Sequence, residues 1–161
     1  MFDFDHISIA VAVLLTALSL RQFRKINMVM LANFWLFALT DKLVPDDQLM
    51  ILQTSYVLIG GLTVKLLVDL KASPPLFVTT FLFSLYNFGI ISEIVLFGQG
   101  AMYNNFVIVA QSQMIIELMI MFLMSWGGLY VCRGLYSKSD YIDHIDRLFR
   151  AGFRLGSKGL T

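Results

Sequence analysis

Cysteine, histidine and charged residues are all scarce in this sequence of 161 residues. The one cysteine, Cys132, excludes an intramolecular disulfide and any cysteine-rich metal site. Neither His6 nor His144 lies in the middle of an apolar run, which argues against a haem held between two buried histidines. Charged residues make up 14% of the chain and apolar residues 58%, whereas soluble domains have about 25% and about 45–50%. The composition therefore predicts an integral membrane protein.

Motifs for catalysis and metal binding are also missing. The sequence contains no G-x-S-x-G, no H-E-x-x-H and no phosphate-binding loop, so we expect no enzyme activity. His6 stands near Asp3 and Asp5 but lacks a third spaced ligand, and we expect no metal site and no cofactor. The positive charge of the C-terminal tail is too modest for nucleic-acid binding.

Five apolar runs are present, and a run of about 20 residues can cross a hydrocarbon core of roughly 30 Å as a helix. We predict an all-α bundle of about five transmembrane helices, followed by a C-terminal amphipathic interfacial helix. Because the first two runs are short, four spans with a re-entrant hairpin are the alternative. The predicted spans, within a transmembrane domain over residues 1–136, are 6–23, 26–44, 49–70, 76–98 and 106–132.

Lysine and arginine are concentrated in alternate connections between the predicted spans. They occur at 21–25, at 65–71 and from Arg133 onward, whereas the connection at 41–47 is mainly acidic and the one at 99–105 is uncharged. Because positively charged connections stay on the cytoplasmic side of a membrane, five spans give an outside N-terminus and a cytoplasmic C-terminus. We expect the membrane to be a bacterial inner (plasma) membrane.

Residues 137–161 are predicted as a separate cytoplasmic tail. Its apolar residues recur at the spacing of one helix face, and its aspartates come before its arginines, as the helix dipole favours. We expect the helix to lie on the cytoplasmic leaflet beside anionic lipids, with docking on a partner subunit as the alternative. The residues predicted to bind lipid or a partner are Arg147, Arg150, Arg154, Phe149 and Phe153.

A carboxylate near the middle of the run 106–132 is the most informative single residue. A charge at that depth costs roughly 2.5–3.5 kcal/mol, so we expect Glu117 to face other helices or a water-filled path. Two interpretations stay open: an ion or proton site, and a hydrogen-bonded carboxyl that holds helices together. The residues predicted to form a polar path or polar helix interface are Glu117, Gln113, Gln111, Asn87, Glu93, Lys65 and Asp69.

Small residues gather on several predicted helix faces, namely Ser8–Ser19, Gly60-Gly61 and Gly127-Gly128. Close helix contact in lipid relies on such faces, so we predict a homo-oligomer or a subunit of a membrane complex. Two functions fit this description. The first is an oligomeric pore, channel or membrane-permeabilising (holin-like) assembly. The second is a non-conducting structural subunit of a larger membrane machine for secretion, motility or virion assembly, whose tail binds a partner or lipid.

Overall fold

The computed structural model describes residues 4–45, 48–72, 74–98, 102–134 and 137–150. The regular elements in these ranges are helices, which confirms the all-helical prediction for this part of the chain. Two short 3₁₀ helices, η1 (Met102–Asn105) and η2 (Cys132–Gly134), join longer helices. The α-helices are α1 (Phe4–Ala17), α2 (Arg24–Leu43), α3 (Leu49–Asp69), α4 (Pro74–Phe97), α5 (Phe106–Leu123), α6 (Trp126–Val131) and α7 (Lys138–Arg150).

Three helices are long and apolar enough to cross a membrane: α3, α4 and the stretch Met102–Leu123 that contains α5. α2 has 20 residues but carries charged residues near both ends, and α1 has only 14 residues. By length and composition, three helices can therefore cross a membrane, whereas five membrane spans were predicted from the sequence. The outer surface is apolar, with Leu58 68% and Ile108 65% exposed. Such a surface fits lipid rather than water.

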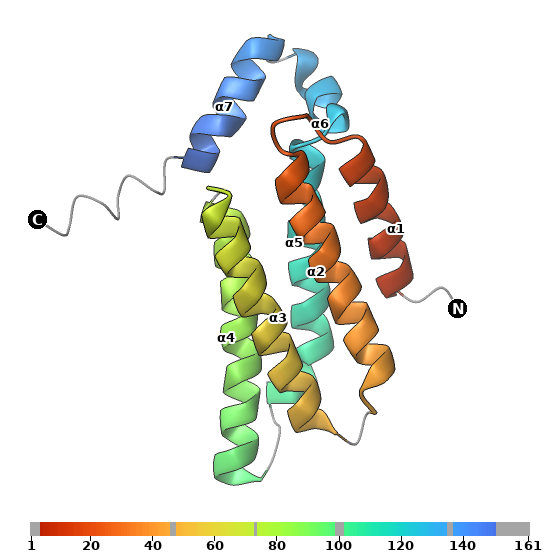
Figure 1. The fold of residues 1–161 in the computed structure, drawn as a ribbon, viewed down its shortest axis with the longest axis vertical. Helices are drawn as coiled ribbons and strands as arrows, with labels where there is room; N and C mark the ends of the chain where they lie inside the picture. Colours follow the sequence, from red (N-terminus) through yellow and green to blue (C-terminus); the bar gives the residue numbers. More distant parts are fainter. Residues whose placement is uncertain (1–3, 46–47, 73, 99–101, 135–136, 151–161) are drawn as a thin grey trace, which may run out of the picture.

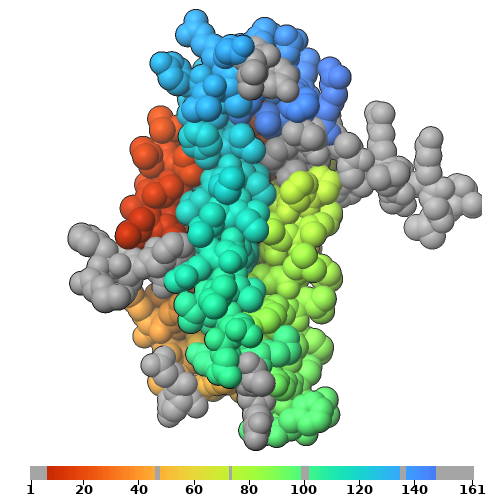
Figure 2. Space-filling view, turned by 180° about the vertical axis from the view of Figure 1, so that it is seen from behind, coloured from red at the N-terminus to blue at the C-terminus, as the bar shows by residue number. Residues whose placement is uncertain are grey.

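The five long helices close into a ring. Each of α1 to α4 packs against the next helix in the chain, and α5 packs against both α4 and α1 (Figure 1). From the opposite side, α5 runs along the middle of the molecule between α1 and α4 (Figure 2). The α1–α2 connection, the α3–α4 connection and α6 lie at one end of the ring. We call it the basic end, because Arg21, Lys71 and Arg133 are exposed there.

The predicted helix over 106–132 is interrupted. α5 ends at Leu123 and α6 begins at Trp126, with Ser125 in an extended conformation between them. The Ser125 hydroxyl oxygen accepts hydrogen bonds from the backbone N–H groups of Gly127 (3.1 Å) and Gly128 (3.4 Å). A serine in this position caps a new helix because its side chain replaces backbone acceptors that the first turn lacks. The run is mainly apolar, and a new helix begins within it after Ser125.

The first predicted helix, 6–23, also ends early, at Ala17. The chain beyond it pairs with the interruption after α5: the Leu20 N–H donates to the Met124 carbonyl (3.0 Å), and the Trp126 N–H donates to the Leu18 carbonyl (2.8 Å). Groups at helix ends have no partner in their own helix. These two interruptions supply partners to each other and join α1 to α5 at the basic end.

α7 packs on the basic end of its own chain. Tyr141 and Ile145 are buried there, while Asp143 and His144 are exposed. The Tyr141 hydroxyl donates to the carbonyl of Leu123, the last residue of α5, at 2.7 Å. Burial, and next the neighbouring thiol of Cys132, raise the pKa of Tyr141 to about 12. The hydroxyl therefore keeps the proton that it donates at neutral pH.

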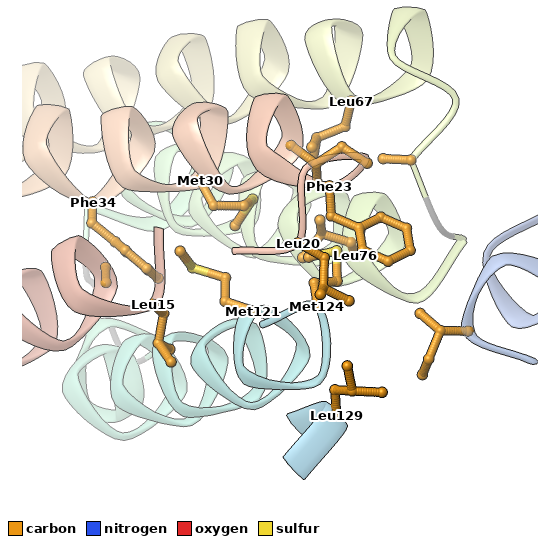
Figure 3. Packing of buried hydrophobic residues seen from close by; sticks show 14 of the residues in the cluster. Leu15, Leu20, Phe23, Met30, Phe34, Leu67, Leu76, Met121, Met124 and Leu129 are labelled. Carbon is orange, nitrogen blue, oxygen red and sulfur yellow. The ribbon is translucent and has the colours of Figure 1, made fainter. Parts of the chain in front are cut away.

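Buried apolar side chains fill the ring near the basic end (Figure 3). They come from α1, α2, α3, α4 and α5, from the α1–α2 connection, and from α6 and α7. We call this group the apolar cluster, and its central members are Leu20, Phe23, Met30, Leu67, Leu76, Met121 and Met124.

The contact between α3 and α4 yields a test of the packing. A Cβ added to Gly60 would lie 3.2 Å from the Ser84 Cβ, whereas one added to Gly61 would meet nothing within 4 Å. We expect Gly60→Ala to lower the free energy of unfolding by about 1–3 kcal/mol through overpacking. Gly61→Ala should raise it by up to about 1 kcal/mol through helix propensity. Unfolding of the purified protein in mixed micelles measures both, and equal effects would contradict this packing.

Candidate functional site

The carboxyl group of Glu117 is completely buried inside the ring. One of its oxygens, Oε1, accepts a hydrogen bond from the Thr80 hydroxyl of α4 at 2.9 Å and one from the Gln113 side-chain amide of α5 at 2.5 Å. Gln113 reaches it because residues four apart lie on the same side of a helix. The other oxygen, Oε2, has no hydrogen-bond partner among the described residues. The carboxyl thus joins two helices and keeps one free acceptor.

Further polar side chains are buried around the ring. The Thr63 hydroxyl of α3 donates to the Asn33 side-chain oxygen of α2 at 2.8 Å. On α4, the Asn87 amide donates to the Phe83 carbonyl at 2.7 Å, and its oxygen has no partner among the described residues. Gln53 of α3 is buried with neither end of its amide hydrogen-bonded in this part of the chain. Buried polar atoms are normally paired, so these groups mark an interior suited to water or a polar ligand.

A cavity of about 60 Å³ connects this interior with the end of the ring opposite the basic end. Asp41, which is exposed near the end of α2, stands at its mouth, and the buried Gln113 lies at its inner limit. The Tyr56 hydroxyl donates to the Asp41 carboxylate. Since Gln113 also donates to Glu117, the cavity leads from an exposed carboxylate to the side chain that is bonded to the buried one.

On the other side of Glu117 the interior is mainly apolar. Met121 and Met124 follow Glu117 on α5, and both are completely buried in the apolar cluster. Figure 3 shows them among Leu20, Leu67 and Leu76, which come from other elements. Buried polar side chains also stand next to members of this cluster in the chain: the Asn27 amide donates to the Ser19 hydroxyl at 3.2 Å, and Ser125 follows Met124. The side of Glu117 toward the basic end is therefore mainly apolar, with a few buried polar groups.

The other residues predicted for the polar path are scattered. Lys65 and Asp69 are exposed on the outer side of α3, and Gln111 is exposed on α5. Glu93 is half-buried near the end of α4 and accepts a hydrogen bond from the Met102 N–H at 2.9 Å. The structure brings together Glu117 and Gln113, and it buries Asn87 on the neighbouring helix. Within this chain, Lys65, Asp69 and Gln111 point outward and lie apart from Glu117, so their place in a polar path or helix interface stays a prediction.

The small faces predicted to support oligomerisation are largely used within the chain. Ser8 is buried, Gly60 lies against Ser84, and a Cβ at Gly128 would lie 2.6 Å from the Phe122 carbonyl oxygen. In these places the small residues allow contacts between helices of the same chain.

The predicted binding residues of the tail lie mostly beyond what the structure describes. Arg147 is exposed on α7. The side chains of Phe149 and Arg150, and the whole of Phe153 and Arg154, lie outside the described residues. Asp3 and the side chains of Asp5 and His6 lie outside them as well. Within the described part of the chain, no three His, Cys, Asp or Glu side chains are grouped as a metal site requires.

Thr80 is the site residue that sequence reasoning missed. Its signal was weak, because threonine in an apolar helix usually bonds to a carbonyl of its own helix. Thr80 does lie 3.1 Å from the Leu76 carbonyl oxygen, yet it also reaches Glu117 on another helix. Only the packing of α4 on α5 identifies it.

Thr80 and its neighbour Thr79 offer a matched pair of substitutions. Thr80→Val should lower the free energy of unfolding by about 1 kcal/mol, because one donor to the buried carboxyl is lost. Thr79→Val should change it by less than about 0.5 kcal/mol, because its hydroxyl contacts only carbonyls of its own helix. Denaturation in mixed micelles compares the two, and similar losses would argue against a link between α4 and α5 through Thr80.

Comparison with known proteins does not identify a family. No family model matches the chain, and neither a curated protein nor a solved structure was found to be similar to it. A functional assignment therefore has to come from Glu117, its donors and the cavity that leads to it.

Proposed function

We propose that the chain is an integral protein of the plasma membrane with five membrane-spanning segments, an outside N-terminus and a cytoplasmic C-terminus. The length and composition of α3, α4 and Met102–Leu123 support three of the segments, and the 20 residues of α2 support a fourth. α1 has 14 residues, or about 21 Å, so the bilayer would thin beside it. The exposed cations of the basic end support the orientation.

Within this bundle we propose a non-enzymatic path for a proton or another small cation, with Glu117 as its binding site. The observation that carries the proposal is the free oxygen of a completely buried carboxyl, which is bonded to Gln113, one of the residues that line a cavity. Ionisable groups at such depth are costly and are found where a protein binds or moves charge. Asp41 at the mouth of the cavity would attract the cation, and Glu117, which lies behind Gln113, would bind it.

The path runs inside one chain in this proposal. A pore around an axis shared by several copies would be lined by outer-surface residues such as Lys65 and Gln111, whereas Glu117 and Gln113 face the interior of their own ring. Assembly into a homo-oligomer or a larger complex is therefore not required. The apolar cluster blocks the way from Glu117 to the basic end, so passage requires it to rearrange. A gated channel or a carrier fits this arrangement better than an open pore.

A second candidate is a non-conducting structural subunit. It is favoured by Oε1 of Glu117, which accepts hydrogen bonds from α4 and from α5 and so stabilises their contact. In such a protein, Glu117 and its hydrogen-bond donors would only stabilise the packing of the helices. The exposed Arg147 and the remaining tail would then bind anionic lipid or a partner.

Ion flux into liposomes that contain the purified protein separates the two candidates. Glu117→Gln keeps the size of the side chain and an acceptor for Thr80, so the fold should survive. We expect it to reduce proton or cation flux by about tenfold or more, because the ionisable group of the path is lost. Glu93→Gln is the matched control and should leave the flux unchanged, since Glu93 lies outside the path.

Two results would overturn the cation path. One is wild-type protein that carries no flux of protons, sodium, potassium or methylammonium at any voltage or pH. The other is a Glu117→Gln variant that conducts as well as the wild type. The structural candidate makes a different forecast: Glu117→Leu would weaken the α4–α5 contact and lower the unfolding midpoint, whereas Glu117→Gln would not.

Topology is tested by reporter fusions after residues 25, 47, 71, 100 and 161. Fusions after 25, 71 and 161 should report the cytoplasmic side, and those after 47 and 100 the opposite side, as the alternation of charged connections requires. Cys132 provides an independent check without a fusion, because a membrane-impermeant thiol reagent should reach it only from the cytoplasmic side. Residues 25 and 47 on the same side would rule out the five-span arrangement.

A further inference from the structure

Aromatic rings from four helices surround the cavity that leads to Glu117. Phe37 of α2 meets Tyr56 of α3 edge-on at 5.1 Å and Phe83 of α4 at 5.6 Å between ring centroids. Phe106 of α5 stacks on Tyr56 at 5.6 Å and lies 6.0 Å from Phe83. All four rings line the same cavity. Each of the helices α2 to α5 thus contributes one ring to its wall.

The polar groups of the cavity are few, and they suit a cation. Among the residues that line it, only Asp41, Tyr56 and Gln113 have oxygen or nitrogen in their side chains. The carboxylate of Asp41 supplies negative charge, and the faces of aromatic rings attract cations electrostatically. An anion would be repelled by Asp41, and a neutral apolar molecule would make no use of it.

The aromatic wall also limits the kind of cation. Alkali and alkaline-earth ions need several oxygen ligands to replace their hydration shell. An alkylammonium ion needs fewer oxygen ligands to replace its hydration shell, and the faces of aromatic rings bind such ions well. A wall of four rings with one carboxylate therefore selects an organic ammonium over a metal ion.

The size of the cavity limits the ligand. A water molecule needs about 10–15 Å³ of such space, so 60 Å³ corresponds to about four to six water-sized groups. Methylammonium has two heavy atoms and trimethylammonium has four, and both fit this limit. Tetraethylammonium, with nine heavy atoms, exceeds it.

We propose that this aromatic cavity binds small alkylammonium ions, from methylammonium to trimethylammonium. The ion lies in the cavity beside these contacting rings, with its charge toward the Asp41 carboxylate or the side-chain oxygen of Gln113. The inference names the cation class of the proposed path, and it rests on that proposed function only for the transport of the bound ion. Binding itself requires no conduction.

Calorimetric titration of the full-length protein in nanodiscs tests the inference. Methylammonium and trimethylammonium should bind at a single site, whereas tetraethylammonium and sodium should not compete for it. Phe83→Leu removes one ring, and Asp41→Asn removes the charge at the mouth. Each should weaken binding by about threefold to tenfold, in keeping with the strength of one cation–π or surface charge contact.

Two control variants separate the cavity from the rest of the molecule. Phe88→Leu changes a phenylalanine of α4 that is 55% exposed, and Asp69→Asn changes an exposed carboxylate of α3; neither residue lines the cavity. Both should bind trimethylammonium as the wild type does. Unfolding midpoints of all four variants identify any loss that comes from misfolding.

The outcomes also distinguish this inference from the proposed path. Absence of alkylammonium binding, or binding that Phe83→Leu and Asp41→Asn leave unchanged, overturns the inference. Proton flux that depends on Glu117 would then still support the path. Alkylammonium binding with the expected variant pattern but without any flux supports the inference and rejects the path.

Discussion

A carboxyl group cannot be left in hydrocarbon, and the arrangement of the ring around Glu117 answers that constraint. Two donors from different helices bind one oxygen, and the helices that provide them have to stay in register for those bonds to form. The same rule extends to the neighbouring helices, where Asn33 and Thr63 pair across α2 and α3. Apolar side chains such as Leu58 face outward instead. An apolar outer surface over buried polar pairs fits lipid rather than water as the surroundings.

The interruption after α5 is the second determinant of the fold. Ending a helix at Leu123 leaves carbonyl groups that need donors, and the chain supplies them from distant segments: the Leu20 N–H and the Tyr141 hydroxyl. α1 and α7 are thereby attached at the same place as the apolar cluster. A rearrangement of that cluster, which the proposed path requires, would disturb these bonds too. α7 and the apolar cluster are thus connected through the end of α5.

The sequence alone predicted the helices, the inward position of Glu117 and its neighbour Gln113, since four-residue spacing is a local property. The sequence did not predict features that depend on contacts between helices, such as which side of a helix faces the interior. Lys65 and Asp69 share a helix side with small polar residues, but that side faces outward in the ring. The break at Ser125 was hidden because the surrounding residues are apolar. The spacing of apolar residues in α7 indicates that one side will be covered, but not by which surface; in the structure Tyr141 and Ile145 are buried against the chain's own bundle.

In the proposed path, the depth of Glu117 couples the occupancy of the site to the membrane potential. It lies eleven residues after Phe106, about 16 Å along α5, and so near the middle of a 30 Å hydrocarbon core. A unit charge that moves from the Asp41 side to this depth crosses about half of the electric field. That is worth roughly 1.1 kcal/mol per 100 mV, or about a sevenfold change in apparent affinity. An inside-negative potential would therefore load the site from outside even at low cation concentration, and depolarisation would empty it.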